Sequence, residues 1–478
     1  FGTSILIQHK TEPSVSLIPA SRRLARRIDQ QVGTFRKIVD RLIKPALAAT
    51  TNTYTIGSGT CGVSACDYST MGAWEAARNG NLVGADTIEK GEMYNNSVFT
   101  DQIVYIEGST TDSTRYMWLT AAVDDRHDGT AGTGVRIDSD SNTSQQVIDV
   151  HDSYTIVEWL EVYDSTPSAT TNTYGLRAQE GSTWQYLIVH DIGGSTSGGS
   201  NNSACFTSWT TSRITDENIY NSIFYNCRSQ GIQMVREIDI YNVTSFNNYG
   251  YGIMDYSGSC NSYTCDIQNV IAMDNDQASN SAADFDSGYG GGEDIMKNNL
   301  SSDGTADDCG TCATNTGNIV NKSSVNQFVS TVTPDLHLKA GSYAIDNGID
   351  LSGTFTDDID SDIRSYTWDI GADEFVGTIV ETNNAVTSGS AASNFSFTHG
   401  LTINENDVVV AIINANTSGQ TILDDNGANS FTEAIEEQNG SQSSRYGIFY
   451  RVAGASEPSA YAFDFDGVGT TEYVAMFR

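Results

Sequence analysis

The chain has 478 residues, in which Lys and Arg total 25 and Asp and Glu total 60, for a formal net charge of −35. Such an acidic chain excludes nucleic acid as a partner, because phosphate binding needs a basic footprint, and it disfavours an anionic membrane surface. No run of about 18 apolar residues occurs, so the sequence predicts no membrane span. The length exceeds one ordinary core and predicts two or three domains.

The first 51 residues form an N-terminal basic arm in this interpretation, since residues 1–44 hold nine basic and three acidic side chains. Residues 2–9 have the pattern of a short strand, and apolar residues then recur at steps of three and four, which predicts an amphipathic helix capped by Ser21 and ended by Pro45. We expect this helix either to cover the open end of the next domain or to dock on another subunit. The residues expected to mediate assembly are Ile5, Leu6, Ile7, Leu24, Ile28, Val32, Phe35, Val39, Leu42, Arg22, Arg23, Arg26 and Arg27.

Eight cysteines fall in close pairs, which predicts disulfides and an extracellular location, whereas the alternative is eight free thiols in a cytosolic protein. The predicted pairs are Cys61 with Cys66, Cys205 with Cys227, Cys260 with Cys265, and Cys309 with Cys312. Sequons that allow glycosylation include Asn95, Asn142, Asn242 and Asn416.

A repeat runs through the middle of the chain, where short apolar segments each close on Asp or Asn. The copies are residues 159–164, 186–191, 221–226, 242–247, 269–274 and 298–303. Repeats of 20–50 residues indicate a solenoid or a propeller, and a propeller blade would need four strands in about 40 residues. We therefore predict a parallel β-helix over residues 52–375, with one strand per repeat, laddered Asn and Asp side chains, and Cys205 and Cys227 bridging adjacent coils.

The end of that region carries a recognisable pattern. Residues 334–348 read Pro-Asp-Leu-His-Leu-Lys-Ala-Gly-Ser-Tyr-Ala-Ile-Asp-Asn-Gly, residues 358–364 read Asp-Ile-Asp-Ser-Asp-Ile-Arg, and residues 369–375 read Asp-Ile-Gly-Ala-Asp-Glu-Phe. This closing segment resembles that of secreted bacterial and phage right-handed parallel β-helix proteins. The resemblance implies an extracellular or surface location and no single activity.

Residues 376–478 form a separate unit with strand patterns at 407–413, 446–452, 460–465 and 473–477, which predicts a β-sandwich. Residues 450–458 are similar to small sandwich modules of phage structural proteins and secreted bacterial proteins, which bind or assemble. Because the last strand runs to the end of the chain, we expect the sandwich to lack an edge strand. The predicted fold class is thus all-β.

Acidic residues are too abundant for the sequence to define a catalytic set. The densest mixed cluster is 124–129, which also reads as a turn after a strand at 116–123. For metal, Asp358, Asp360 and Asp362, with Asp369 at the twelfth position, imitate a calcium loop. Ile363 stands where that loop needs glycine, and a turn-forming acidic stretch is the alternative. Calcium is the one cofactor that the sequence suggests.

Two functions compete. The first is an extracellular structural subunit of a filament or surface assembly, whose partners are copies of itself joined head to tail through the N-terminal arm. The second is a carbohydrate-binding or polysaccharide-cleaving β-helix, such as a phage tailspike or a secreted lyase, with glycans as partners. The basic arm on an acidic body favours the first, so catalysis is the less expected outcome.

Overall fold

The computed structural model describes most of two compact units, Phe1–Phe375 and Val376–Arg478. The described residues are 49–100, 103–139, 146–166, 174–193, 203–209, 217–235, 237–256, 265–278, 282–286, 294–309, 312–364, 367–376, 382–385, 394–398, 400–403, 407–416, 422–424, 429–438, 445–454, 456–465 and 470–477. The expected N-terminal strand and helix lie outside these ranges. Within them, no helix is long and apolar enough to cross a membrane.

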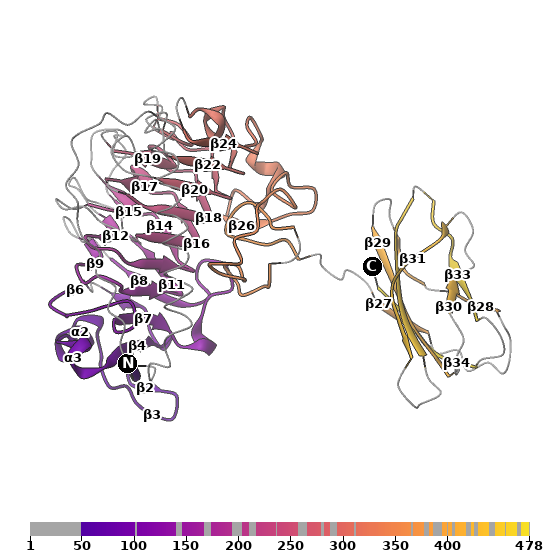
Figure 1. Ribbon diagram of the computed structural model, residues 1–478, viewed down its shortest axis with the longest axis horizontal. Helices are drawn as coiled ribbons and strands as arrows, with labels where there is room; N and C mark the ends of the chain where they lie inside the picture. The colour runs from indigo at the N-terminus through magenta and orange to yellow at the C-terminus, as the bar shows by residue number, and fades with distance from the viewer. Residues whose placement is uncertain are drawn as a thin grey trace, which may run out of the picture. The chain divides into compact units, whose positions relative to one another are not determined.

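The first unit is a right-handed parallel β-helix in which every coil stacks on the next (Figure 1). Its first ladder contains β1 (Thr50–Ile56), β4 (Thr87–Met93), β7 (Met117–Ala121), β10 (Ile156–Glu158), β13 (Thr183–Gln185), β16 (Asn218–Tyr225), β18 (Asp239–Phe246), β20 (Asp266–Gln268), β22 (Ile295–Lys297) and β24 (Thr314–Thr316). The second contains β5 (Phe99–Thr100), β8 (Val135–Asp138), β11 (Leu160–Tyr163), β14 (Ile188–His190), the C-terminal halves of β16 and β18, β21 (Ile271–Met273) and β23 (Leu300–Ser301). The third contains β6 (Val104–Ile106), β9 (Gln146–Val150), β12 (Tyr174–Ala178), β15 (Ala204–Thr207), β17 (Gln230–Met234) and β19 (Ile253–Asp255).

The predicted β-helix is therefore confirmed, but a complete coil has three strands where the sequence repeat predicted one. The repeat coincides with the second strand of each coil. Its first residue has a positive φ in all six copies: Trp159, Tyr186, Asn221, Asn242, Asn269 and Asn298. Asn tolerates this left-handed conformation better than most residues. These six residues, called the corner row below, turn the chain from the first ladder into the second.

The first coil is covered by α2 (Met71–Arg78), which is followed by α3 (Leu82–Ala85) and preceded by the hairpin of β2 (Thr60–Cys61) and β3 (Ser64–Ala65). Trp74 of α2 is fully buried against the inward face of β4, where a Cβ at Gly91 would lie 2.8 Å from its ring. Gly91 thus leaves the space that the indole fills. Short 3-10 turns occur at Val123–Asp125, Thr305–Asp307 and Ser324–Asn326.

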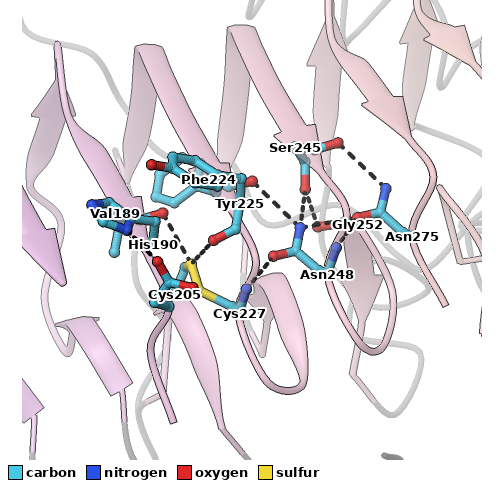
Figure 2. Close-up of a disulfide and its surroundings, with 11 residues drawn as sticks. Val189, His190, Cys205, Phe224, Tyr225, Cys227, Ser245, Asn248, Gly252 and Asn275 are labelled. Carbon is cyan, nitrogen blue, oxygen red and sulfur yellow. Dashed lines mark hydrogen bonds and ion pairs between the residues drawn. A yellow bond between two sulfur atoms is a disulfide. The ribbon is translucent and has the colours of Figure 1, made fainter. Parts of the chain in front are cut away.

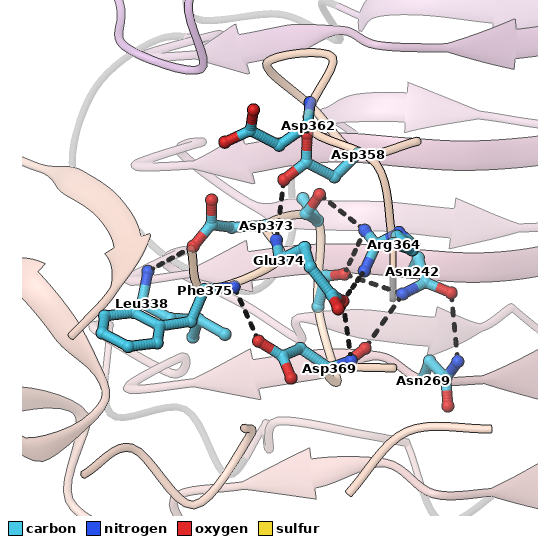
Figure 3. A network of polar contacts seen from close by, with 12 residues as sticks. Asn242, Asn269, Leu338, Asp358, Asp362, Arg364, Asp369, Asp373, Glu374 and Phe375 are labelled. Atoms are coloured by element: carbon cyan, nitrogen blue, oxygen red, sulfur yellow. Dashed lines mark hydrogen bonds and ion pairs between the residues drawn. The ribbon is translucent and has the colours of Figure 1, made fainter. Parts of the chain in front are cut away.

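The closing segment, residues 334–375, packs along the corner row. It begins with β26 (Asp335–Leu338), which pairs antiparallel with β25 (Phe328–Ser330). The side-chain amide of Asn242 donates to the carbonyl oxygens of Asp369 and Gly371 (Figure 3). The side-chain amide of Asn269 donates to the carbonyl oxygen of Ile349. The polar corners of the coils are therefore satisfied by the backbone of a segment far along the chain.

The second unit is an antiparallel sandwich of a five-stranded and a three-stranded sheet. The strands are β27 (Thr382–Ala385), β28 (Asn394–Thr398), β29 (Val408–Asn416), β30 (Ile422–Asp424), β31 (Thr432–Gln438), β32 (Arg445–Val452), β33 (Ala460–Phe465) and β34 (Thr470–Phe477), in the orders β27-β34-β29-β32-β31 and β28-β33-β30. Val409, Ile413, Phe449 and Phe463 are buried in its core. The last strand is not itself an edge, because β34 lies between β27 and β29.

Candidate functional site

The third ladder carries a row of polar side chains at its N-terminal end. Residues two apart on a strand share a face, and Tyr105 and Arg177 pair in register with Asp149 on the strand between them. Glu107, His151 and Gln179 lie two positions further along the same three segments. We refer to these six residues as the outer-face cluster.

Asp149 is the centre of this cluster and is fully buried. The guanidinium of Arg177 donates from Nε to its Oδ1 at 3.0 Å and from Nη2 to its Oδ2, which is a bidentate ion pair. The side-chain amide of Gln179 lies 3.2 Å from the same Oδ1. The same amide is 3.4 Å from Oδ2, and the other neighbour of this carboxylate in the described residues is His151. The ion pair and the amide together therefore orient that histidine.

His151 lies at the surface of the cluster with 31% of its side chain exposed. Its Nε2 is 3.2 Å from Oδ2 of Asp149 and 2.8 Å from Nε2 of Gln179, and its Nδ1 is 3.9 Å from Oε2 of the exposed Glu107. The ring of Tyr105, itself 38% exposed, lies beside it with centroids 6.2 Å apart. An imidazole with acidic partners on both nitrogens can accept or donate a proton.

The cluster predicted at 124–129 has structural roles. His127 is buried, with Nε2 2.8 Å from the carbonyl oxygen of Tyr186, and burial lowers its pKa. Asp128 accepts from the hydroxyl of Thr133 and the backbone N–H of Thr130, which closes a turn. The structure therefore has a turn at residues 124–129, as the alternative interpretation of this stretch predicted.

The four residues proposed for calcium are placed differently from a calcium loop. Asp358 accepts backbone hydrogen bonds from Asp360, Asp362 and Glu374, and burial, with the charge of Asp360, raises its pKa to about 9. Asp369 accepts from the backbone N–H groups of Asp346 and Phe375. Both carboxyl groups thus stabilise turns of the closing segment, as Figure 3 shows.

A different group gathers in the closing segment. One ligand atom each of His337, Asp360 and Asp373 lies within 4.8 Å of the others, and in the described residues this is the one such set. Of the four predicted residues only Asp360 belongs to it. His337 lies within the closing pattern, but it precedes its two partners by more than 20 residues, so spacing did not mark it as a ligand.

Three of the four predicted disulfides are present: Cys61–Cys66, Cys205–Cys227 and Cys309–Cys312. Cys205 lies on β15 and Cys227 precedes β17, the strand stacked on β15, so this bridge joins adjacent coils as predicted (Figure 2). Cys265 is also disulfide-bonded, and its predicted partner Cys260 lies outside the described residues.

Asn242 cannot carry a glycan in the folded chain, because it is fully buried and its amide is hydrogen-bonded to the closing segment. Asn95 is exposed and stays a predicted acceptor. Asn142 lies outside the described residues, and for Asn416 only its place in β29 is described.

No protein-family model and no curated protein matches the chain. Among solved structures, the chain is similar to pectate lyase Pel9A, with a TM-score of 0.37 and 14% identity over 69% of this chain and 97% of that one. It is also similar to the enzymatically active domain of tailspike protein 2 of bacteriophage CBA120, with a TM-score of 0.24 and 9% identity over 90% of this chain and 72% of that one. At these identities the likeness extends to the β-helix fold and no further.

Proposed function

We propose that this chain is an extracellular polysaccharide-binding and polysaccharide-cleaving β-helix, whose outer-face cluster binds the glycan and transfers the proton in bond cleavage. The proposal rests on His151, a partly exposed imidazole that the buried Asp149–Arg177 pair orients beside an exposed tyrosine. His151 is the proton-transferring residue, Tyr105 stacks on a sugar ring, and Glu107 is the second acid–base group.

A coil with only a structural role does not need a buried ion pair beside a partly exposed histidine. Burying a carboxylate costs free energy that an ion pair repays only with good geometry, and the pair here leads to one solvent-facing histidine. The disulfides are consistent with an oxidising compartment, where a secreted depolymerase or a virion protein works.

The test is a depolymerisation screen with purified chain on neutral and uronic-acid polysaccharides, with and without Ca²⁺. Reducing ends measure total cleavage, and ultraviolet absorbance of unsaturated uronides distinguishes elimination from hydrolysis. We expect His151→Ala to lower the cleavage rate by about 100-fold or more, since general acid–base catalysis contributes that much.

Asp124→Asn, which alters an exposed carboxylate outside the cluster, is the matched control and should cleave at the wild-type rate. Affinity electrophoresis on the same glycans reports binding independently of cleavage. A panel that the wild type neither binds nor cleaves, or cleavage that His151→Ala leaves intact, contradicts the proposal.

Assembly with copies of the same chain is the second candidate, and the sandwich favours it. On the five-stranded sheet, the face opposite the core carries exposed Val408, Ile412, Tyr446, Tyr450 and Val452. Val408 pairs in register with Val452, so these side chains are neighbours on β29 and β32. Contiguous exposed apolar patches commonly mark interaction sites.

Light scattering distinguishes the routes to assembly. Deleting residues 1–44 should yield monomers if the basic arm joins the subunits, whereas Ile412→Ser with Tyr450→Ser should do so if the sandwich face joins them. Ser459→Ala, an exposed polar position, is the control. A wild-type chain that is monomeric at high concentration contradicts both routes.

A further inference from the structure

We infer that His337, Asp360 and Asp373 form a binding site for a zinc-class divalent metal ion, which cross-links three parts of the closing segment beside the early coil that carries Asp128. The three ligand atoms lie within 4.8 Å of one another. Nε2 of His337 is 3.6 Å from Oδ2 of Asp360, and Asp373 is buried beside them. A small shift of these side chains brings all three to the distances of a coordinated ion.

The second nitrogen of His337 is already held as in a metal-bound histidine. Nδ1 lies 2.6 Å from Oδ1 of Asp335, two residues earlier on β26. A carboxylate on the far nitrogen fixes the ring and leaves Nε2 to the metal, an arrangement that metal-ligating histidines almost always have. Nε2 is therefore the nitrogen that points toward Asp360.

Asp360 contributes a carboxylate whose Oδ1 is buried and accepts no hydrogen bond from an N–H or alcohol group of the described residues. Its neighbours are other side chains of the closing segment, because it interacts with the protonated carboxyl group of Asp358 and with His337. A cation bound between His337, Asp360 and Asp373 would give this buried carboxylate a positively charged partner.

The loop after β7 keeps the space around Nε2 open. A Cβ at Gly129, whose φ is +77°, would lie 2.4 Å from Nε2 of His337, and the carbonyl oxygen of Asp128 is 3.2 Å from the same atom. That carbonyl or a water can complete a tetrahedral shell. Asp128 belongs to an early coil. With its carbonyl oxygen as the fourth ligand, the ion links that coil to the closing segment.

The donor set selects the class of metal. Calcium takes six to eight oxygen ligands, whereas an imidazole with two carboxylates suits Zn²⁺ and its first-row neighbours. The set proposed here shares Asp360 with the residues expected for calcium and adds one nitrogen ligand, His337. Its role is structural, because binding to the folded state alone stabilises that state.

The experiment is titration calorimetry and thermal unfolding of the full chain, stripped with a chelator, with ZnCl₂ and separately with CaCl₂. We expect one equivalent of Zn²⁺, with binding abolished in His337→Ala and Asp360→Asn. Asp335→Asn should weaken binding by about 10–100-fold, since it removes only the supporting carboxylate. Asp362→Asn, an exposed neighbouring carboxylate, and His151→Ala should bind as the wild type does.

Substitution by Co²⁺ adds a readout that does not depend on stability, because a nitrogen- and oxygen-bound tetrahedral ion absorbs in the visible. The band should appear in the wild type and be absent from His337→Ala. Zn²⁺ binding that persists in both ligand variants, a wild type that binds no Zn²⁺, or a preference for Ca²⁺ would overturn the inference. Circular dichroism confirms that each variant is folded.

Discussion

The guanidinium of Arg364 donates to Oδ1 of Asn221 at 3.0 Å, across 143 residues of sequence. The same guanidinium donates to the carbonyl oxygens of Gly371 and Ala372 and pairs with Glu374. One fully buried cation therefore fixes the closing segment internally and to the corner row at once. We call this set of Arg364 contacts the clamp. Most of its residues belong to the two motifs, 358–364 and 369–375, by which the closing segment was recognised in the sequence.

Arg364→Met should lower the free energy of unfolding by about 3–5 kcal/mol, because it leaves the buried carboxylate of Glu374 and several carbonyls without their donor. Urea unfolding followed by tryptophan fluorescence measures it, since all six Trp residues precede residue 376 and report the first unit. Arg115→Met removes partly exposed ion pairs with Asp86 and Asp112 and should change the free energy of unfolding by less than about 1 kcal/mol. Equal effects of the two substitutions would contradict the clamp.

The corner row makes a second prediction, at Asn269. Its φ is 56°, its amide donates to Asn242 and to the carbonyl of Ile349, and its Oδ1 accepts from the N–H of Ile349. Asn269→Ala loses these hydrogen bonds and strains the left-handed backbone, so its free energy of unfolding should be about 2–3 kcal/mol lower than that of the wild type.

Asn269→Gly loses the same hydrogen bonds without the steric strain, so it should be more stable than Asn269→Ala by about 1 kcal/mol. The same fluorescence-monitored unfolding resolves that order. A glycine variant less stable than the alanine variant would mean that backbone conformation has no part in the choice of Asn.

The corner row also explains how much of the fold could be predicted. The six copies of the repeat were visible because each short apolar strand closes on Asp or Asn, and at Asp191, Asn226, Asn247 and Asp274 this closing residue has a positive φ, as the corner row does. The strands of the first and third ladders lack such a marker and vary in length, so one strand was predicted where there are three. α2 was missed because its eight residues span only two turns and carry no long apolar stripe.

The outer-face cluster could not be assembled from sequence for a related reason. Asp149 and Arg177 are 28 residues apart, and their contact depends on the register of β9 against β12. Because the loops between strands differ in length from coil to coil, that register cannot be read from the spacing of residues in the sequence. The acidic composition then supplies so many carboxylates that sequence spacing alone cannot choose among them.

Glu217 predicts a pH dependence of stability. It is completely buried and accepts from the backbone N–H and the hydroxyl of Ser182, and burial raises its pKa well above the ordinary value. The folded state therefore retains this proton when the unfolded state has lost it. Stability from this group is complete below the unfolded pKa and declines as pH rises, by at most about 1.4 kcal/mol per pH unit.

Glu217→Gln keeps the shape and carries no charge, so its stability relative to wild type should rise steadily from about pH 4.5 upward. Urea unfolding at a series of pH values measures the difference. Asp124→Asn, exposed in the loop after β7, should show a constant difference. A difference between Glu217→Gln and wild type that does not change with pH would show that Glu217 is ionised in the fold.

Asp149 and Arg177 provide the last prediction, which separates the stability of the outer-face cluster from its function. Arg177→Met should lower the free energy of unfolding by about 3–5 kcal/mol, because it removes the bidentate cation of the buried Asp149 and leaves that carboxylate with only Gln179 and His151 as partners. The double variant Asp149→Asn with Arg177→Met should regain most of that loss, and a double-mutant cycle gives the coupling. If the pair orients His151 for catalysis, the stable double variant should still fail to cleave glycan, whereas full cleavage by it would reduce the pair to a structural role.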